Sequence, residues 1–361
     1  MHPEDILLVS QESLSALEGI HTPLLAWYDQ NARALPWREN PNPYRVWISE
    51  IMLQQTRVEA VRSYFTRFVA ELANPAALAA VPDDRLLKLW EGLGYYSRAR
   101  NLKGAAKQIM ERFAGALPAS YAALLSLPGI GEYTAGAVAS IAFGIPVPAV
   151  DGNVLRVLSR LAGSYADISL PAVKQAYRQT LVIPHNRPGD FNQSLMELGA
   201  LICLPNAAPL CGRCPLRGVC AGYQGGCALE LPQKARRKAR RIEERTIVLI
   251  TSQSGVLLFR RGKGLLSGMY EPLNLPSHLA GDALRSALLD MGASPGAFDY
   301  LGTAKHLFTH VEWRMQGYHV RSESFPAPEN AVWATPREVK KSYAIPSAFD
   351  AYITYLHGDS R

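Results

Sequence analysis

The period of the hydrophobic pattern changes once along this chain of 361 residues, and that change constrains the fold more than any other feature. From about Gln11 to Gly222, apolar residues recur at three- and four-residue spacing, as in PAALAAVPDDRLLKLWEGLG, with breaks at Pro and Gly. From Thr246 onward the pattern alternates. TIVLITSQSGVLLFRR predicts two strands joined by a turn, HVEWRMQGYHV predicts another strand, and ALRSALLDMG predicts one short helix. We therefore expect an all-α domain followed by a smaller α/β domain.

A dense run of Arg and Lys, LPQKARRKARRIEERT, lies at residues 231–246, where the two patterns meet. We accordingly place the helical domain at residues 1–225, a basic linker at residues 226–245 and the α/β domain at residues 246–361. A solvated connection explains the linker's charges, and DNA contact is a second role that they allow.

The composition favours a polyanionic partner, because the net charge is +7 and the pI is about 9.1, although many basic proteins bind no polyanion. No apolar run reaches membrane-spanning length, so we expect no membrane partner. The first residues, MHPEDILLVSQES, are acidic and lack the basic region that opens a secretory signal. We therefore expect a cytoplasmic protein.

Four of the five cysteines lie in one segment, CLPNAAPLCGRCPLRGVC, with the spacing C-x7-C-x2-C-x5-C. Disulfides are disfavoured in a reducing compartment, whereas four thiolates at one site suit tetrahedral zinc or a 4Fe–4S cluster. Structural zinc more often uses two separated cysteine pairs, so a single loop leans towards the cluster, but the spacing leaves both open. The candidate ligands are Cys203, Cys211, Cys214 and Cys220.

A glycine turn, PGIG, lies inside LPGIGEYTAGAVASIAFG (residues 127–144), between the end of an apolar helix and a helix rich in small residues. Glycines let a turn expose backbone N–H groups, and the N-terminus of the following helix adds a positive dipole end, so the turn can hold a phosphate. A plain helix–helix turn remains the alternative explanation.

Two carboxylates stand out by their positions. Glu50, in the helical pattern VWISEIMLQQT, has Val46, Trp47 and Leu53 as its neighbours at helical spacing. A carboxylate there is costly unless it is paired or protonated. Asp151, in PVPAVDGNVLRVLSR, precedes a helical pattern, where a helix N-cap is its plain explanation and catalysis the alternative.

Taken together, these elements resemble the helix–hairpin–helix DNA glycosylases, and specifically the adenine DNA glycosylases of the MutY type. The resemblance spans about Trp27 to Cys220 and continues more weakly to the end of the chain. It rests on LPWRENPNPYRVWISEIMLQQT, EGLGYYSRARNL, LPGIGEYTAGAVAS, VDGNVLRVLSR, FNQSLMELGALIC and the cysteine loop. It implies a helix–hairpin–helix at about residues 124–143, a 4Fe–4S cluster held by the loop at residues 203–220, and a Nudix-like second domain.

The resemblance also implies a reaction. Adenine mispaired with 8-oxoguanine, or with guanine, is flipped out of double-stranded DNA by a monomeric enzyme at the nucleoid, and its glycosidic bond is hydrolysed. Glu50 stands at the family's catalytic glutamate and would protonate the purine. Asp151 stands at the catalytic aspartate and would stabilise the oxocarbenium-like sugar or attack it.

Other family positions carry over one by one. Tyr133 and Asn153 would support the catalytic pair, and Arg38 would line the adenine pocket, although it could also be a surface cation. Gln55 and Tyr95 match positions that push into the duplex, although Tyr95 could also be a core residue. Contacts to DNA phosphate would come from the N–H groups of Gly129 and Gly131.

Two departures bear on these expectations. The family's first cysteine interval usually has six intervening residues and this chain has seven, which leaves Cys227 as an alternative to Cys203. We expect Cys203, because it ends MELGALIC. Bifunctional relatives such as endonuclease III carry a lysine where this chain has Tyr133, so Schiff-base strand cleavage would lack its nucleophile.

The C-terminal region resembles the Nudix-like domain that reads 8-oxoguanine in this family. A Nudix hydrolase needs the helix R-E-x-x-E-E-x-G, but the frame from Arg285 to Gly292 contains no glutamate, which suggests recognition and not hydrolysis. The lesion-reading loop would be Phe308, Thr309 and His310, with Thr where Ser is usual.

Two other functions are alternatives for this sequence. One is an endonuclease III–like glycosylase for oxidised pyrimidines, which Tyr133 and the second domain argue against. The other is a catalytically silent DNA-binding protein, which would need neither Glu50 nor Asp151.

Overall fold

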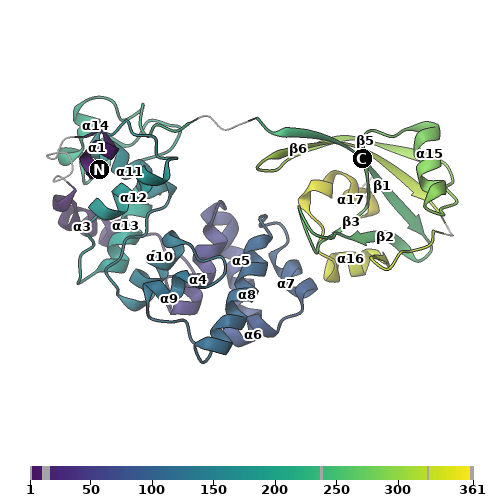
Figure 1. Ribbon diagram of the computed structural model, residues 1–361, viewed down its shortest axis with the longest axis horizontal. Helices are drawn as coiled ribbons and strands as arrows, with labels where there is room; N and C mark the ends of the chain where they lie inside the picture. Colours follow the sequence, from purple (N-terminus) through teal and green to yellow (C-terminus); the bar gives the residue numbers. More distant parts are fainter. Residues whose placement is uncertain (1, 10–16, 236–238, 323–324, 358–361) are drawn as a thin grey trace. The chain divides into compact units, whose positions relative to one another are not determined.

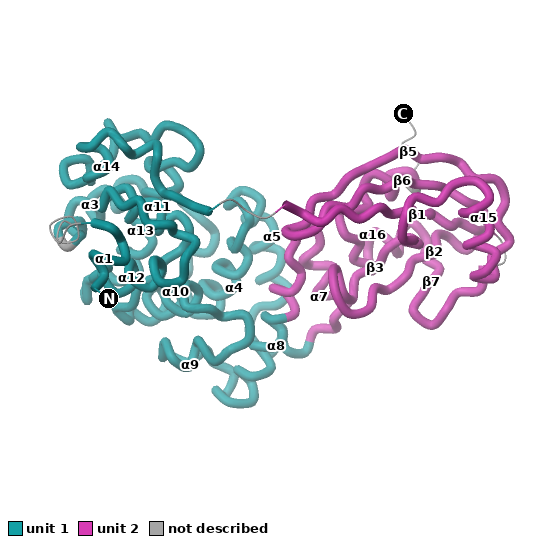
Figure 2. The backbone as a smooth tube through the Cα atoms, turned by 45° about the horizontal axis from the view of Figure 1, so that its top comes forward, with its two compact units in different colours: residues 1–80, 101–236 teal, residues 81–100, 237–361 magenta. Residues whose placement is uncertain are grey.

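The computed structural model describes residues 2–9, 17–235, 239–322 and 325–357 (Figure 1). By packing, the chain divides into two compact units, one of residues 1–80 and 101–236 and one of residues 81–100 and 237–361 (Figure 2). The helical domain and the α/β domain expected from the sequence are both present. None of the helices in the described ranges has the length and apolar character that crossing a bilayer requires.

The first unit is helical, as its hydrophobic period predicted. Its helices are α1 (Pro3–Leu7), α3 (His21–Asn31), α4 (Pro43–Leu53), α5 (Val58–Glu71), α6 (Pro75–Ala80), α8 (Ser97–Arg112, which begins in the other unit), α9 (Tyr121–Leu125), α10 (Glu132–Phe143), α11 (Gly152–Ala162), α12 (Pro171–Thr180), α13 (Pro188–Leu201) and α14 (Ala221–Gln224), with 3-10 turns η1 (Glu18–Ile20), η2 (Cys211–Arg213) and η3 (Arg217–Val219).

Helix α10 lies at the centre of this unit, packed against α4 and α13. Small residues make the close packing possible. A Cβ at Gly136 would lie 2.2 Å from the carbonyl oxygen of Pro148, so no larger residue fits where α10 meets the segment that leads to Asp151. The packing therefore brings α4, α10 and the start of α11 together.

The second unit is built on a seven-stranded mixed sheet of order β3-β2-β1-β6-β5, with β4 paired to β1 and β7 paired to β2. Its strands are β1 (Arg241–Ser252), β2 (Gly255–Arg260), β3 (Tyr270–Glu271), β4 (Leu273–Pro276), β5 (Phe298–Leu307), β6 (Val311–Arg321) and β7 (Ala331–Ala334). Its other elements are α7 (Asp83–Trp90), α15 (Gly281–Asp290), α16 (Pro336–Ser342), α17 (Asp350–Ile353), η4 (Ser347–Phe349) and η5 (Thr354–His357).

Alternation along β1 feeds two hydrophobic cores on opposite faces of the sheet. Ile247 and Leu249 pack with residues of α16, η4 and α17, whereas Val248 and Ile250 pack with residues of α15. On β6, Trp313 and Met315 belong to the first of these cores and Val311 packs against it, so alternate residues of the predicted strand share one face.

The beginning of β1 differs from the sequence expectation. The strand starts at Arg241, inside the segment 226–245 that we expected to be a linker, and Arg241–Arg245 pair in parallel with Val311–Met315 of β6. The charged side chains there are satisfied locally, since Glu243 pairs with Arg241 and Arg245 and accepts a hydrogen bond from Trp313 Nε1 at 3.1 Å. Paired charges can occupy a strand that would otherwise read as solvated loop.

Candidate active site and DNA interface

Glu50 lies on α4, which begins where Asn42 Oδ1 accepts a hydrogen bond from the backbone N–H of Arg45 at 2.9 Å. Its side chain is buried, with 6% of the residue exposed. Tyr133, from the first turn of α10, donates its hydroxyl to Glu50 Oε2 at 2.5 Å. Burial raises the pKa of Glu50 from 4.5 to about 7, although the Tyr133 hydrogen bond acts in the opposite direction. The carboxyl can therefore carry a proton near neutral pH.

Asp151 is the N-cap of α11, and its Oδ1 accepts the backbone N–H of Val154 at 2.7 Å. Its other oxygen accepts a hydrogen bond from Asn153 Nδ2 at 2.9 Å. Burial raises the pKa of Asp151, while these two hydrogen bonds favour its ionised form. Asp151 is close enough to Glu50 to raise the pKa of Glu50 through its charge. The N-cap role is thus real, and it holds a second carboxyl beside the first.

A pocket opens at Glu50 and is also lined by Tyr28, Trp37, Arg38 and Gln193. Arg38 is fixed in its wall by Gln193 Oε1, which accepts from Nε at 2.9 Å, and by Glu197 Oε1, which accepts from Nη2 at 2.9 Å. An anchored, half-buried guanidinium of this kind is not a surface cation. The pocket therefore offers a hydrogen-bonding cation and a protonatable acid to one ligand.

Helix α13 supplies polar residues that the sequence reading did not select. Glu197, 2% exposed, binds both Arg33 and Arg38, while Asn192, fully buried, bonds to Ala149 N at 2.9 Å and so steadies the approach to Asp151. A signal for them existed. Gln193 and Glu197 are four residues apart on the otherwise apolar helix FNQSLMELGAL, where a buried carboxylate needs partners.

The PGIG turn has the backbone that only glycine tolerates. Gly129 has φ +76°, and a Cβ there would lie 2.6 Å from Cβ of Asn101. Gly131 is the N-cap of α10, and a Cβ placed on it would meet nothing within 4 Å, so this position faces open space. The turn thus presents a helix N-terminus without side-chain interference, which is the geometry an anion requires.

The two residues predicted to enter the duplex share an uncommon backbone conformation. Gln55, just after α4, has φ +57°, and Tyr95, between α7 and α8, has φ +48°. Both are exposed, Tyr95 at 46%. Non-glycine residues in this region are strained, and such strain concentrates at functional sites. Tyr95 is therefore not a core residue.

The predicted lesion-reading loop is the tight turn between β5 and β6. Phe308 N donates to Val311 O at 2.8 Å, and Arg240 Nε donates to Phe308 O at 2.8 Å. The Phe308 ring packs edge-on against the buried Trp313, with 4.9 Å between ring centroids. Thr309 and His310 are exposed at the tip. The loop is anchored by its aromatic residue and leaves two polar side chains available.

The four cysteines Cys203, Cys211, Cys214 and Cys220 line one small pocket, with otherwise mostly apolar walls from α11 and α13. Burial, with a contribution from the three other thiols, raises the pKa of Cys214 to about 11. Across the described ranges, no group of three or more His, Cys, Asp or Glu is arranged to hold a single metal ion. Four thiols around one pocket are the kind of donor set that a 4Fe–4S cluster takes.

Two buried arginines of α11 contact Cys203, and one of them also links it through Asn153 to Asp151. Arg160 Nη1 lies 3.2 Å from Cys203 Sγ. Arg156 donates to the carbonyl of Cys203 at 2.9 Å and to Asn153 Oδ1 at 3.0 Å, and Asn153 in turn contacts Asp151. Of the described cysteines, Cys227 is not among the residues that line the pocket. The geometry thus favours Cys203 as the fourth sulfur.

Two family models match the chain. The model described as the HhH-GPD superfamily base excision DNA repair protein matches residues 48–181, and the model described as the NUDIX domain matches residues 245–355. The first covers Glu50, Tyr133 and Asp151. The second covers Phe308, Thr309 and His310.

Several characterised relatives match most of the chain. The adenine DNA glycosylase of Mus musculus is 36% identical over 93% of this chain and 78% of its own, and that of Homo sapiens is 34% identical over 93% and 75%. Among solved structures, a thermostable thymine-DNA glycosylase (28% identity, TM-score 0.53) and endonuclease III in a non-covalent complex with DNA (26% identity, TM-score 0.50) each match 58% of this chain, and 98% and 97% of their own.

Proposed function

Because the chain belongs to the adenine DNA glycosylase family, and so is a base excision repair enzyme that hydrolyses the N-glycosidic bond of adenine, we propose that its substrate is adenine paired with 8-oxoguanine in double-stranded DNA. Adenine opposite undamaged guanine is the second substrate, and the enzyme acts as a monomer. The observation that carries the proposal is the buried, protonatable Glu50 at a pocket that also holds Arg38.

Glu50 acts as the general acid. A flipped adenine enters the pocket, and Glu50 donates its proton to a ring nitrogen of the base, so that the purine leaves without accumulating negative charge. A carboxyl with a pKa of about 7 is suited to this task, because it holds the proton near neutral pH and is still a strong enough acid to give it up. Tyr133 fixes the carboxyl by its hydrogen bond, and Arg38 binds the edge of the base.

Asp151 handles the positive charge that develops on the sugar. As the bond between C1′ and the base nitrogen breaks, an ionised Asp151 stabilises the oxocarbenium-like carbon or attacks it, and water then completes hydrolysis. Asn153 and the N–H of Val154 support this role, since both donate to Asp151 and favour its charged state. The two carboxyl groups thus take opposite protonation states because their surroundings differ.

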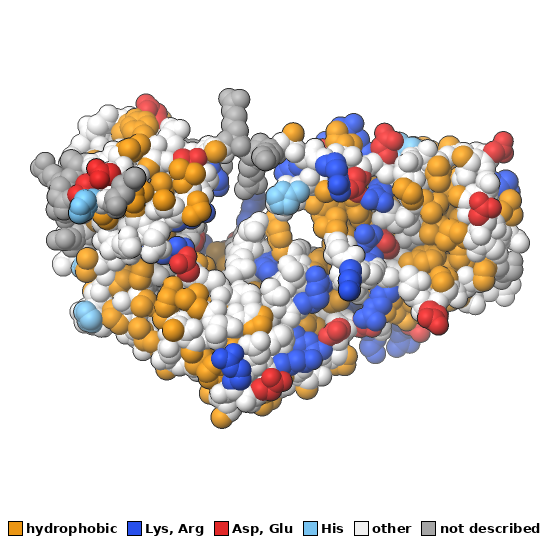
Figure 3. All heavy atoms as spheres, in the orientation of Figure 1, with side chains coloured by type: hydrophobic (Ala, Val, Ile, Leu, Met, Phe, Trp, Pro, Cys, Tyr) orange, Lys and Arg blue, Asp and Glu red, His pale blue; other side chains and the backbone are white. Residues whose placement is uncertain are grey.

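The proposed DNA contacts come from four turns. The Gly129–Gly131 turn holds a backbone phosphate. Gln55 and Tyr95, both exposed and strained, enter the duplex beside the lesion, and the loop of Phe308, Thr309 and His310 reads the oxidised guanine. The net charge of +7 favours a polyanion, and Lys and Arg side chains gather in several groups on the face drawn in Figure 3.

The reaction ends at the abasic site. A bifunctional glycosylase needs an amine to form a Schiff base with the sugar aldehyde, and this chain has Tyr133 at the position where such relatives carry lysine. We therefore propose a monofunctional enzyme.

Cys203, Cys211, Cys214 and Cys220 hold a 4Fe–4S cluster in this proposal. When bound, the cluster supplies four iron–sulfur bonds that tie the loop after α13 to itself. The chain's own contribution is to bury the thiols and to place Arg160 beside Cys203, where its positive charge favours an anionic site.

The variant Glu50→Gln tests the central role. It should bind a duplex containing 8-oxoguanine·adenine as tightly as the wild type but excise adenine about a hundred- to ten-thousandfold more slowly in single-turnover assays, since it has no proton to donate. Glu59→Gln, on an exposed part of α5, is the matched control and should be unaffected. A Glu50→Gln rate within a few-fold of the wild type would show that another group is the acid.

A further inference from the structure

Residues 81–100 lie within the sequence span of the helical domain, yet they pack with the C-terminal unit (Figure 2). Arg260 of β2 binds Asp84 at 3.0 Å, and Arg100 Nη1 donates to the carbonyl of Ser267 at 2.7 Å. Exposed pairs of this kind contribute little by themselves. A more buried attachment lies in the pocket lined by α7 and by the segment from α16 to α17.

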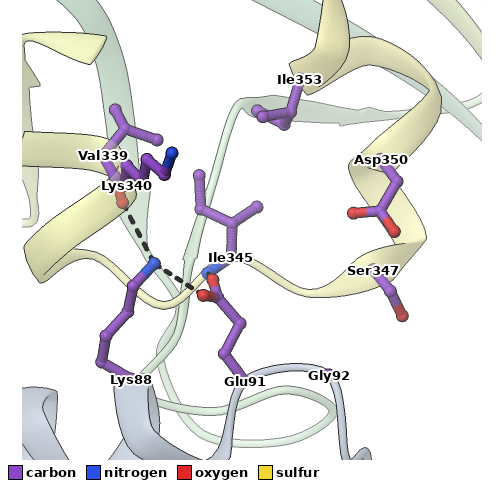
Figure 4. Close-up of a pocket in the computed structure, with 9 residues that line it drawn as sticks. All are labelled: Lys88, Glu91, Gly92, Val339, Lys340, Ile345, Ser347, Asp350 and Ile353. Atoms are coloured by element: carbon purple, nitrogen blue, oxygen red, sulfur yellow. Dashed lines mark hydrogen bonds and ion pairs between the residues drawn. The ribbon is translucent and has the colours of Figure 1, made fainter. Parts of the chain in front are cut away.

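Lys88 is the centre of this attachment. Its ammonium donates to the carbonyl of Val339 at 3.2 Å and pairs with Glu91 Oε2 at 2.6 Å (Figure 4). It also donates to the carbonyl of Tyr343 at 3.0 Å. Val339 is in the last turn of α16 and Tyr343 is its C-cap, so the cation sits at the negative end of the helix. The side chain is only 13% exposed, and all three ammonium protons have an acceptor.

Glu91 completes the arrangement from the other direction. Its Oε1 accepts the backbone N–H of Ile345 at 2.7 Å, while its other oxygen holds Lys88. One i,i+3 ion pair therefore holds a helix C-terminus and the chain that follows it by three hydrogen bonds. We refer to Lys88 and Glu91 as the clamp.

The clamp is followed immediately by the loop that carries Tyr95. Gly92, Gly94 and Tyr95 have φ values of +93°, +72° and +48°. Trp90 Nε1 donates to Gly94 O at 3.1 Å, and Arg98 Nη2 donates to the carbonyls of Leu93 and Gly94 at 3.1 and 3.0 Å. With its carbonyls fixed, this short loop transmits a displacement of Glu91 to Tyr95 instead of absorbing it.

Tyr95 in turn lies beside the lesion-reading loop, with its hydroxyl 3.5 Å from Thr309 Oγ1. The residue is 46% exposed, although the Arg98 guanidinium lies over its ring at 5.7 Å from the centroid, so Tyr95 is supported from one side and still accessible. The relative position of Tyr95 and Thr309 therefore depends on how residues 81–100 pack within this unit, and the clamp is more buried than the Asp84–Arg260 pair that also holds them.

We infer that Lys88 and Glu91 are positioning residues for selectivity: by gripping the C-terminus of α16, they fix Tyr95 against the Phe308–His310 loop, and the pair of elements together distinguishes 8-oxoguanine from guanine opposite adenine. This inference rests on the proposed function, because it assumes that Tyr95 and Thr309 read that base. It adds residues that contact neither DNA nor the reacting atoms.

The test is the variant Lys88→Met, which keeps the apolar stem and removes the three donors. Its single-turnover excision rate on 8-oxoguanine·adenine duplexes should fall about three- to tenfold, while the rate on guanine·adenine duplexes changes less than twofold. Lys88→Arg, which restores a cation with several donors, should recover most of the preference. Arg62→Met, which breaks the i,i+3 pair with Glu59 on α5, is the matched control and should leave the ratio of the two rates unchanged.

A second background separates this inference from the proposed function. In a Tyr95→Ser enzyme, whose preference should already be reduced, Lys88→Met should produce no further loss, because the clamp acts through Tyr95. If Tyr95→Ser alone leaves the ratio unchanged, Tyr95 takes no part in the selectivity and the inference about the clamp is wrong, whereas the proposed reading by the Phe308–His310 loop is tested separately with Thr309→Ala/His310→Ala. If Tyr95→Ser lowers the ratio but Lys88→Met does not, or lowers both rates equally, the clamp is only structural. Glu91→Gln, which keeps the acceptor for Ile345 and loses the ion pair, should give an intermediate loss and serves if Lys88→Met does not fold.

Discussion

At the scale of single residues, the proposed chemistry depends on the carboxyl group of Glu50, whose pKa is raised by folding. Glu50 is buried among apolar neighbours and receives one hydrogen bond, from Tyr133. Keeping an acid in such a place costs stability whenever the acid is charged, and the cost is useful only if the group has a chemical role. This predicts an effect of Glu50 that can be measured without any DNA.

Replacing Glu50 by Gln should stabilise the protein at high pH. The pKa of Glu50 is raised from 4.5 to about 7 in the folded state, so stability contributed by the protonated carboxyl is present below pH 4.5 and is lost as the pH rises through 7. Gln does not titrate. At pH 8 the variant should therefore be more stable by about 2 kcal/mol, an advantage that shrinks towards zero near pH 5. Urea unfolding at both pH values checks this, and a pH-independent difference would refute the burial argument.

Asp151→Asn separates catalysis from helix capping. Asn is as good an N-cap as Asp, so the start of α11 should remain intact and the melting temperature should change little. The neutral amide cannot stabilise a developing cation, and excision should slow by about a hundredfold or more. Circular dichroism melting and single-turnover excision make the comparison. Full activity in the Asn variant would leave Asp151 with the N-cap role alone.

The sequence allowed Glu50 to be selected because an acid among apolar residues of one helix is conspicuous. Glu197 could not be selected in the same way, because its partners Arg33 and Arg38 are more than 150 positions away and only the packing of α13 brings them together. Residues that act through long-range pairing leave only an indirect sign in a single sequence, such as the spacing of Gln193 and Glu197.

At the scale of elements, the proposed cluster in the loop between α13 and α14 depends on which cysteines supply its ligands. Cys203→Ser should lose iron, whereas Cys227→Ser should keep about four irons per chain, because Cys203 lines the pocket with Cys211, Cys214 and Cys220. Iron analysis and the yellow-brown absorbance of anaerobically purified protein make the measurement. Stoichiometric zinc in the wild type, or iron loss in Cys227→Ser and not in Cys203→Ser, would contradict the ligand assignment.

The helical period predicted α4, whereas the boundaries of elements were harder to predict from the sequence. The prediction failed at β1. Residues 241–245 are mostly charged, as in a solvated loop, and Trp313, which bonds to Glu243, becomes a neighbour only when β6 pairs with β1. The clamp at α7 was missed for the same reason, since Val339 and Tyr343 are about 250 positions away.

At the scale of the whole molecule, the residues that we propose for the chemistry and those that we propose for lesion reading belong to different units. Glu50, Asp151 and the PGIG turn belong to the helical unit, whereas Tyr95 and the Phe308–His310 loop belong to the other. The hydrophobic period predicted two domains, but it could not predict that residues 81–100 pack with the second, because that depends on contacts between distant segments. A change confined to the second unit should therefore alter selectivity more than the chemical step.

The double variant Thr309→Ala/His310→Ala tests this division. Both residues are exposed at the tip of an anchored turn, so their removal should not unfold the unit. Losing hydrogen bonds to a base edge costs about 1–3 kcal/mol for a good contact, and the ratio of excision rates opposite 8-oxoguanine and guanine should fall roughly tenfold or more. Equal ratios in variant and wild type would place lesion reading elsewhere, with Gln55 and Tyr95 as the candidates.

We propose that this enzyme removes adenine opposite 8-oxoguanine and leaves the strand intact. A panel of duplexes, carrying 8-oxoguanine·adenine, guanine·adenine, thymine·adenine and an oxidised pyrimidine paired with guanine, tests it directly when base release and strand breaks are measured before and after alkali. We predict adenine release fastest opposite 8-oxoguanine and slower opposite guanine, with strand breaks only after alkali treatment. Release of the oxidised pyrimidine, equal release opposite both guanines, or efficient strand cleavage without alkali would contradict the account.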